Sequence, residues 1–187
     1  MHVPLVAGAR SCATAARVPA VEPIAALQAR VLATARALDP AVEEIWIDPQ
    51  SADTAAFCAH YGYAPEESGN CILVRSKTGD LRYAACVVQA TRQLDLNRHS
   101  RLLVDARKAS FAGADETIER TGMVPGGVTP IALPDDVPVF VDEPIMRLDR
   151  VIVGGGGREL KLRLRTAALR ALDCLTVADI GRSPRTT

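Results

Sequence analysis

Short apolar stretches bounded by glycine, proline or polar residues recur along the chain and predict β-strands. The clearest pair is N-C-I-L-V-R-S at residues 70–76 and L-R-Y-A-A-C-V-V-Q at residues 81–89, separated by K-T-G-D. The glycine of that connection suits a hairpin turn, so we expect the two strands to pair antiparallel. Shorter strands are expected at residues 44–47, 108–112, 137–141, 151–153 and 160–164.

Apolar residues at helical spacing predict helices between these strands. In residues 23–38, Ile24, Leu27 and Val31 fall near that spacing, and a D-P pair ends the segment. Short strands and helices that are interspersed, without regular βαβ crossovers, predict an α+β fold. We expect a single compact domain with a mixed, largely antiparallel sheet and short flanking helices. The other expected helices are residues 54–60 (capped by Ser51 or Asp53), 96–104 (Asp95), 116–120 (Asp115) and 167–172, with a helical turn at 143–147.

Domain organisation follows from the length of the chain and from its two ends. The 187 residues suit one domain, which we expect to span residues 22–178. Residues 1–21 lack acidic residues and carry Arg10 and Arg17, which leaves a transit peptide open, but a disordered tail or an over-extended start is favoured. Residues 179–187 are expected to form a loose C-terminal tail. No apolar stretch approaches the roughly 20 residues that cross a bilayer, so no membrane association is expected.

Charge and cysteine content narrow the class of protein. The formal net charge is zero, with 22 basic and 22 acidic residues, so any contact with nucleic acid depends on a local patch. The cysteines are odd in number and none belongs to a C-x-x-C pair, which predicts a reducing, cytoplasmic setting. They are Cys12, Cys58, Cys71, Cys86 and Cys174.

The familiar motifs of metal and nucleotide chemistry are absent from the sequence. It contains no H-E-x-x-H, C-x-x-C or clustered aspartates, so neither a metal nor a cofactor is predicted. It also lacks a G-x-S-x-G elbow and a G-x-x-x-x-G-K-[ST] loop. Four glycines at residues 154–157 follow a predicted strand, but the alternating stretch R-E-L-K-L-R-L comes next, where a dinucleotide-binding loop requires a helix. This glycine run is therefore either a tight turn between strands or a backbone edge that faces a ligand.

An uncharged segment rich in glycine and proline, T-G-M-V-P-G-G-V-T-P, occupies residues 121–130. Three glycines and two prolines exclude a helix or a central strand. A connector at this place is usually polar, whereas an uncharged loop can present its own N–H and C=O groups to a ligand. Composition leaves two interpretations, a tight turn after a helix and a ligand-binding loop.

The order of motifs from about residue 51 to residue 172 resembles the YbaK/EbsC family. That family includes the editing insertion domain of bacterial prolyl-tRNA synthetases and freestanding aminoacyl-tRNA deacylases. The hairpin is followed by R-Q-L-D-L-N, by K-A-S-F-A and by E-R-T-G-M-V-P-G-G-V-T-P, which is similar to the family's T-G…G-G-(V/I)-(S/T)-P loop. P-V-F-V-D-E and V-I-V-G-G-G are similar to its late strands. The resemblance implies a compact α+β domain that binds the 3′ end of a mischarged tRNA and hydrolyses the aminoacyl ester.

The resemblance also implies a site built from main-chain groups. An aminoacyl ester is already activated, so positioning of water and stabilisation of the oxyanion suffice for hydrolysis. We expect the N–H groups of Gly126, Gly127 and Val128 to be the catalytic groups that hold the substrate carbonyl or the terminal ribose. The implied partners are the acceptor end of a mischarged tRNA and an aminoacyl-tRNA synthetase. The substrate-binding residues expected nearby are Asn70, Cys71, Gly122, Thr129, Pro130, Gly154, Gly155 and Lys161.

The sequence departs from the family at a lysine that members typically carry on the first hairpin strand. Alignment of that pattern with G-N-C-I places Asn70 at the lysine position and Cys71 after it. Asn70 keeps hydrogen-bonding capacity but lacks the charge. No histidine is placed to activate Cys71, so thiol catalysis is not predicted. Of the lysines, which are Lys77, Lys108 and Lys161, the last follows the glycine run and faces the pocket if strand alternation points it inward.

Three functions stay open at the level of sequence. The first is a freestanding deacylase that acts in trans, with water positioned by the loop at residues 126–130. The second is a catalytically inactive relative that binds an aminoacyl-tRNA or nucleotide end as a sensor or binding module. The third is an unrelated small-molecule enzyme or structural protein. Phosphate contacts, with a solvated mixed-charge surface as the alternative, are expected from Arg75, Arg82, Arg107, Arg158, Arg163 and Arg165.

Overall fold

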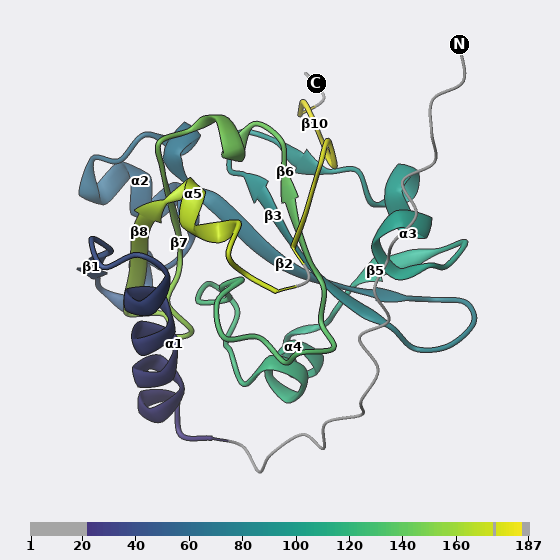
Figure 1. The fold of residues 1–187 in the computed structure, drawn as a ribbon, viewed down its shortest axis with the longest axis horizontal. Coiled ribbons are helices and arrows are strands. Elements are labelled where there is room, and N and C mark those ends of the chain that lie inside the picture. Colours follow the sequence, from purple (N-terminus) through teal and green to yellow (C-terminus); the bar gives the residue numbers. More distant parts are fainter. Residues whose placement is uncertain (1–21, 174, 185–187) are drawn as a thin grey trace.

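A five-stranded mixed sheet forms the centre of the computed structural model, which describes residues 22–173 and 175–184 (Figure 1). The expected N-terminal tail lies outside these described residues. β2 pairs antiparallel with β3 and β5, whereas β3, β6 and β9 run parallel. The predicted hairpin and the predicted α+β class are confirmed. In sheet order the strands are β5 (Ala109–Phe111), β2 (Gly69–Ser76), β3 (Tyr83–Gln89), β6 (Val139–Asp142) and β9 (Leu175–Ala178).

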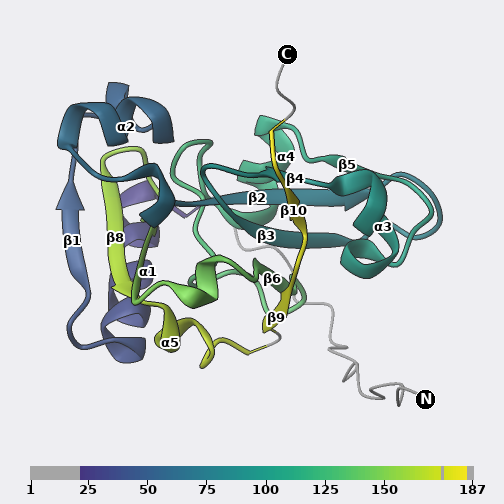
Figure 2. The same ribbon diagram turned by 90° about the horizontal axis from the view of Figure 1, so that it is seen from above.

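A smaller antiparallel sheet lies beside the start of β2. Its strands, in sheet order, are β1 (Glu43–Trp46), β8 (Leu160–Arg165) and β7 (Arg150–Gly154). A bridge between Ser68 and Ile152 joins this sheet to the residue that precedes β2. Figure 2 shows the two sheets next to each other along the length of the molecule.

Helices occupy most of the expected ranges. Asp53 caps the second helix and Asp95 caps the third, as predicted. The fourth helix begins after Gly113 rather than after Asp115, because the Glu116 carboxylate accepts a hydrogen bond of 3.3 Å from the Gly113 amide. The helices are α1 (Ile24–Leu38), α2 (Thr54–Tyr61), α3 (Leu96–Val104), α4 (Ala114–Thr121) and α5 (Thr166–Leu169), with 3₁₀ turns η1 (Pro49–Ser51), η2 (Pro65–Glu67) and η3 (Ile145–Arg147).

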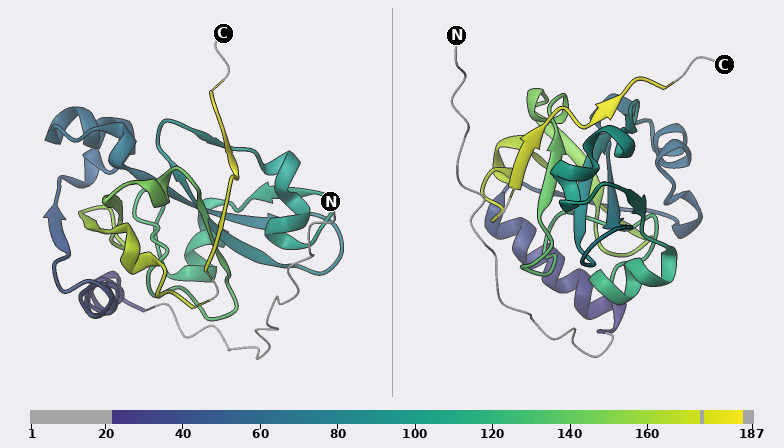
Figure 3. Two further views of the ribbon diagram at one scale, coloured as in Figure 1. Left: turned by 45° about the horizontal axis from the view of Figure 1, so that its top comes forward. Right: turned by 90° about the vertical axis from the view of Figure 1, so that its right-hand side faces the viewer.

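Among the described residues the core has three apolar clusters, of which the two larger lie on opposite sides of the molecule and the third joins α2 to β7. The first joins α1 to alternate residues of β8, and its fully buried members include Leu27, Val31, Leu160, Leu162 and Leu164. The second joins α3 and the C-terminal segment to the other face of the central sheet, and its members include Val74, Cys86, Leu103, Phe140 and Ile180. Figure 3 shows α1 and β10 (Gly181–Arg182) on opposite sides accordingly. Because side chains alternate along a strand, Lys161 of β8 points away from α1.

The described part of the C-terminal segment is ordered by specific contacts, contrary to the loose tail expected from residue 179 onward. Ile180 is fully buried, and β10 pairs with β4 (Gln93–Leu94). The buried carboxylate of Asp142 accepts hydrogen bonds from the amides of Ile180 (3.1 Å) and of the following residue (3.0 Å). These contacts compensate the burial of a charged group, so the compact fold extends at least through β10.

Candidate active site

A cleft of about 460 Å³ lies where the two sheets meet, between the N-terminus of α2, the start of β2 and the glycine- and proline-rich loop. We call it the α2 cleft. It brings together residues that are distant in the sequence and that include six of those predicted for the site. Among the residues that line it are Asp53, Thr54, Asn70, Cys71, Gly126, Val128, Gly154 and Lys161.

The glycine- and proline-rich loop packs directly against the glycine run. The amide of Gly156 donates a hydrogen bond of 2.7 Å to the Gly127 carbonyl oxygen. A Cβ on Gly127 would collide with the main chain of Gly157, and a Cβ on Gly154 would collide with the main chain of Gly127. Both segments are therefore rich in glycine because two backbones are in contact. The Gly127 amide donates to the Val124 carbonyl oxygen (2.9 Å), so it is not available to a substrate, contrary to the expectation.

Two main-chain amides of the loop stay free to donate. In a trans peptide the N–H points opposite to the C=O of the same unit. The carbonyl of Pro125 accepts from Arg158 (3.1 Å), so the Gly126 N–H points away from that side chain. The Gly127 carbonyl oxygen, in the peptide unit before Val128, accepts from the Gly156 amide, so the Val128 N–H points away from the glycine run. Among the described residues, neither amide donates to a protein acceptor.

Lys161 of β8 places a buried amino group at the floor of the cleft. Its side chain is 6% exposed, and its Nζ donates hydrogen bonds of 2.8 Å to the carbonyl oxygens of Ala52 and Gly126. Burial lowers the pKa of Lys161 to about 8, and the nearby Asp53 carboxylate offsets only part of that effect. The Phe57 ring centroid lies 5.8 Å from Nζ. An ammonium has three N–H donors, so one remains for a ligand in the cleft.

Two predicted residues of β2 line the cleft in different ways. The Asn70 Oδ1 accepts a hydrogen bond of 2.5 Å from the Thr54 hydroxyl, which leaves the amide nitrogen of Asn70 as a donor. Burial raises the pKa of the Cys71 thiol to about 12, so this cysteine is a neutral wall residue and not a nucleophile. β5 pairs with residues 74–76 of β2 and stops before this part of the strand.

Asp53 is a cleft residue that the sequence suggests only as a helix cap. Its Oδ1 accepts hydrogen bonds from the amides of Ala55 (3.0 Å) and Ala56 (3.5 Å) at the start of α2. Its side chain is exposed, and it carries the one carboxylate among the described residues that line the cleft. The second carboxylate oxygen can therefore accept hydrogen bonds from a cationic ligand.

Four predicted substrate-binding residues lie outside the cleft wall. Gly122 ends α4 with a φ of 74°. Thr129 and Pro130 are buried, and the Thr129 hydroxyl accepts from the amide two residues later (3.5 Å). The Gly155 amide donates to the Leu160 carbonyl oxygen (2.9 Å). These contacts hold the shape of the loop and of the glycine run.

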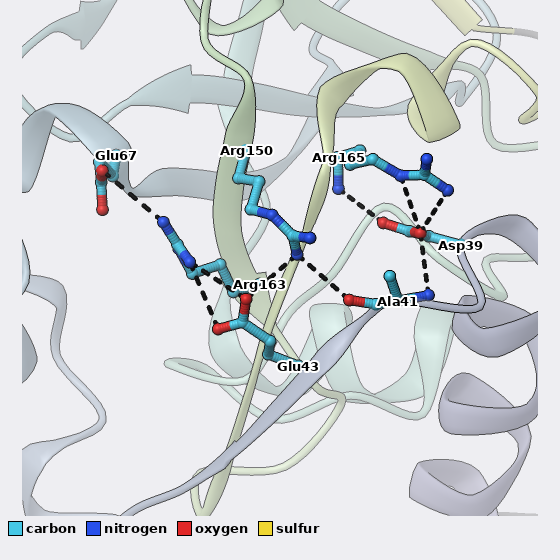
Figure 4. Close-up of polar contacts among 7 residues, drawn as sticks. All are labelled: Asp39, Ala41, Glu43, Glu67, Arg150, Arg163 and Arg165. Atoms are coloured by element: carbon cyan, nitrogen blue, oxygen red, sulfur yellow. Dashed lines mark hydrogen bonds and ion pairs between the residues drawn. The ribbon is translucent and has the colours of Figure 1, made fainter.

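Two of the arginines proposed for phosphate binding are committed to carboxylates (Figure 4). Arg163 lies 3.1 Å from Glu43 and 3.9 Å from Glu67, and Arg165 lies 2.7 Å from the fully buried Asp39. Burial by itself raises the pKa of Asp39, but the hydrogen bonds from Arg165 and from the Ala41 amide, together with the Arg165 charge, outweigh it and hold that pKa below its ordinary value. The Arg163–Glu43 pair links β8 to β1, and the Arg165–Asp39 pair links β8 to the end of α1.

Of the other four arginines proposed for phosphate binding, two pair with carboxylates and two do not. Arg75 and Arg82 also pair with carboxylates, at 2.8 Å and 2.6 Å. Arg107 is exposed and lies outside the cleft. Arg158 is exposed at the rim beside Gly126, and it has no carboxylate partner among the described residues.

Within residues 22–173 and 175–184, no three histidine, cysteine or acidic side chains gather in a way that could hold a metal ion. None of the helices in these ranges has the length and apolarity that a membrane crossing requires.

Comparisons with known proteins agree with the geometry of the fold. The chain matches a crystal structure of a hypothetical protein with a TM-score of 0.71 and 23% identity, over 82% of this chain and 99% of that one. It matches a candidate trans-editing enzyme for prolyl-tRNA synthetase with a TM-score of 0.70 and 19% identity, over 84% and 98%. A candidate signal transduction protein from Marinobacter aquaeolei VT8 matches at 0.55 and 18%, over 82% of this chain and 30% of that one.

A family model provides the functional class. The model described as the aminoacyl-tRNA editing domain matches residues 48–172, almost the range over which the motifs resemble the YbaK/EbsC family. This range contains the α2 cleft, both glycine-rich segments and Lys161. The chain belongs to the aminoacyl-tRNA editing domain family.

Proposed function

We propose that this protein is an aminoacyl-tRNA deacylase that acts in trans on mischarged tRNA. Water adds to the acyl carbon of the aminoacyl ester, the bond to the ribose oxygen breaks, and that oxygen takes up the proton lost by the water. The observation that carries the proposal is the α2 cleft itself. It combines two unpartnered main-chain amides with a buried lysine in a member of an editing-domain family.

The amides of Gly126 and Val128 are the proposed donors to the oxyanion. An activated ester needs mainly water positioning and charge stabilisation, and one preorganised oxyanion donor contributes about 10²–10³-fold to the rate. The third N–H of Lys161 adds a charged donor on the same side of the cleft. Because Lys161 also binds the Gly126 carbonyl oxygen, it keeps the loop in the shape that presents these amides.

The groups on either side of the ester are bound by side chains at the start of α2 and of β2. The α-ammonium of an aminoacyl ester is positively charged, and the Asp53 carboxylate is its proposed acceptor. The amide nitrogen of Asn70 is left free by the bond from Thr54, and it donates to a hydroxyl of the terminal ribose. Pocket size then selects among amino acids, at about 1–3 kcal/mol for each methylene.

The proposed setting is the cytoplasm, with an aminoacyl-tRNA synthetase as a further partner. Cys58, Cys71 and Cys86 are free thiols, which supports a reducing compartment. Arg158 at the rim of the cleft is the proposed contact for acceptor-strand phosphate.

The direct test is hydrolysis of a panel of mischarged tRNAs by the purified protein. The panel covers small and medium-sized amino acids, and the ester remaining is followed over time against a buffer control. We expect at least one pair to be hydrolysed well above the spontaneous rate. Turnover equal to buffer across the panel would exclude the deacylase function.

A binding module without turnover is the second candidate function. It is favoured by the absence of a lysine at the Asn70 position and by the bond that ties the Asn70 side chain to Thr54. This function predicts measurable binding of a non-hydrolysable aminoacyl-adenosine amide in the α2 cleft together with no hydrolysis of any mischarged tRNA.

A further inference from the structure

A second cleft of about 580 Å³ adjoins the α2 cleft on the side of α3. We call it the α3 cleft. The two share Asn70 and Ile72 in their walls, so both border the start of β2. The proposed deacylase function does not use this second cleft.

One face of the central sheet supplies the floor of the α3 cleft. Asn70 and Ile72 lie two residues apart on β2 and therefore on the same face. Asn70 is paired with Val88, and two residues beyond Ile72 the strand pairs with Phe111 at the end of β5. Side chains that face each other across antiparallel strands share a face, so Phe111, opposite Val74, lies on the same face as Ile72, and both line the cleft.

The C-terminal segment builds part of the opposite wall. Arg92 lies 2.8 Å from the buried Asp142 and 2.6 Å from Asp179, so two carboxylates compensate its charge. Arg182 of β10 pairs in register with Gln93, and both residues line the cleft. Unlike Arg92, Arg182 has no acidic partner among the described residues. The cleft is therefore lined by one arginine without an acidic partner, Arg182, and by the Asp95 carboxylate, which accepts a hydrogen bond from the Arg98 amide at the start of α3.

Phe111 is unusual among the large apolar residues of the chain. Its side chain is 55% exposed although it borders a cleft. An exposed aromatic ring beside apolar side chains, with amide side chains and an arginine nearby, is the arrangement that binds an unstacked base and its phosphate. The amide side chains here are those of Gln93 and Asn97.

We propose that the α3 cleft binds the nucleotide that precedes the acylated terminal nucleotide of the acceptor strand. Its base stacks on Phe111, and the phosphate that joins it to the terminal nucleotide approaches Arg182. The shared wall residues Asn70 and Ile72 carry the assignment, because a chain whose acylated end lies in one cleft can pass over them into the other. This inference rests on the proposed function and extends it from the ester to the polynucleotide.

The experiment compares two esters of one amino acid, chosen from the panel above. The first is the aminoacyl-adenosine, and the second is the aminoacyl ester of the dinucleotide CpA. We expect the wild-type protein to hydrolyse the dinucleotide ester with a kcat/KM about 10-fold higher, the size of effect expected from one stacked base. Phe111→Ala should remove most of that preference and leave the adenosine ester unaffected.

Two controls keep the outcome interpretable. Leu81→Ala removes another apolar side chain, 57% exposed, that lies outside both clefts, and should change neither rate. Thermal unfolding of each variant shows that the fold is retained, as expected for exposed positions. Arg182→Ala should lower kcat/KM for the dinucleotide ester alone.

Other outcomes overturn the proposal. Equal hydrolysis of the two esters by the wild-type protein, or equal losses on both esters in Phe111→Ala, would mean that the cleft does not bind the preceding nucleotide. If neither ester is hydrolysed, the proposed function fails, and binding of unacylated CpA to the full chain then tests this inference alone. Weaker CpA binding by Phe111→Ala than by Leu81→Ala would support it, and no CpA binding by the wild-type protein would refute it.

Discussion

The Nζ of Lys161 donates a hydrogen bond of 2.8 Å to the carbonyl oxygen of Gly126, which lies 35 residues earlier in the chain. This contact joins β8 to the loop that lines the α2 cleft. It orients the peptide unit that follows Gly126 and places a buried positive charge next to the free amides of the loop. The same lysine therefore supports the shape of the site and contributes to its electrostatic potential.

Lys161→Met is expected to lower kcat/KM for hydrolysis of the mischarged tRNA by about 10²-fold, the size of effect seen when one oxyanion donor is removed. Methionine has a similar length but neither donates a hydrogen bond nor carries a charge. The loss of the donor to two carbonyl oxygens destabilises the fold, and the removal of a buried charge stabilises it, so the two effects on stability oppose each other. Initial rates and thermal unfolding measured on the same preparation separate activity from stability.

The matched control for that variant is Lys77→Met, in the exposed hairpin turn. It removes the same charge from the protein and should leave kcat/KM unchanged. A loss as large in the control as at position 161, or an unchanged kcat/KM in a folded Lys161→Met protein, would contradict the role given to this lysine.

The pH dependence of kcat/KM is expected to show the titration of Lys161. Its pKa is lowered to about 8, chiefly by burial. On an N-acetylated aminoacyl ester, which has no titrating amino group, we expect kcat/KM to fall as pH rises through about 8 after subtraction of the spontaneous rate, because the ammonium form of Lys161 supplies the charged donor. On that ester Lys161→Met should lack this inflection. A rise through the same range would instead indicate that the neutral amine acts as a base.

Asp53→Asn is expected to raise KM about 10-fold for an aminoacyl ester, because the carboxylate that accepts the α-ammonium is lost. Asparagine caps a helix about as well as aspartate, so α2 should keep its start. An N-acetylated aminoacyl ester lacks the ammonium, and Asp53→Asn should hydrolyse it as the wild-type protein does. Equal losses on both esters would show that Asp53 acts through the fold and not through the α-amino group.

Local patterns were sufficient to predict most of the fold. The K-T-G-D turn, the Asp53 cap and the left-handed Gly122 each depend on residues within a few positions of one another. The C-terminal segment was not predictable in this way. Its order depends on Asp142, whose carboxylate binds the Ile180 amide from 38 residues earlier, and no short pattern encodes that contact.

The candidate site was only partly predictable from the sequence. Motif order drew attention to the segment around Gly126, and Lys161 was expected in the pocket on the condition that strand alternation points it inward, as the structure has it. The amide of Gly127 was wrongly expected to be free, because composition does not show which amide of the loop closes the turn onto the Val124 carbonyl oxygen. Pairs such as Arg163 with Glu43 span 120 residues, so the sequence could not show which arginines are already neutralised.

Gly127→Ala is expected to destabilise the fold by about 1–3 kcal/mol, the range for overpacking, because the added Cβ meets the main chain of Gly157, which has little room to move. Thermal unfolding measures the loss as a lower Tm. Gly113→Ala is the control, since nothing lies within 4 Å of its added Cβ, and its cost should stay below about 1 kcal/mol. Equal stability of the two variants would mean that the loop and the glycine run separate easily.

Arg158→Ala is expected to weaken tRNA binding and to reduce the slope of log K against log salt by about one, the contribution of one phosphate contact. The reason is that Arg158 is exposed at the rim of the α2 cleft and is held by carbonyl oxygens rather than by a carboxylate. Arg82→Ala is the matched control, because Arg82 is equally cationic but already lies 2.6 Å from Asp105. Binding titrations of each variant with unacylated tRNA at several salt concentrations give the slopes. An unchanged slope in Arg158→Ala would exclude a phosphate contact at this rim, and an equal reduction in Arg82→Ala would show that the effect comes from overall charge.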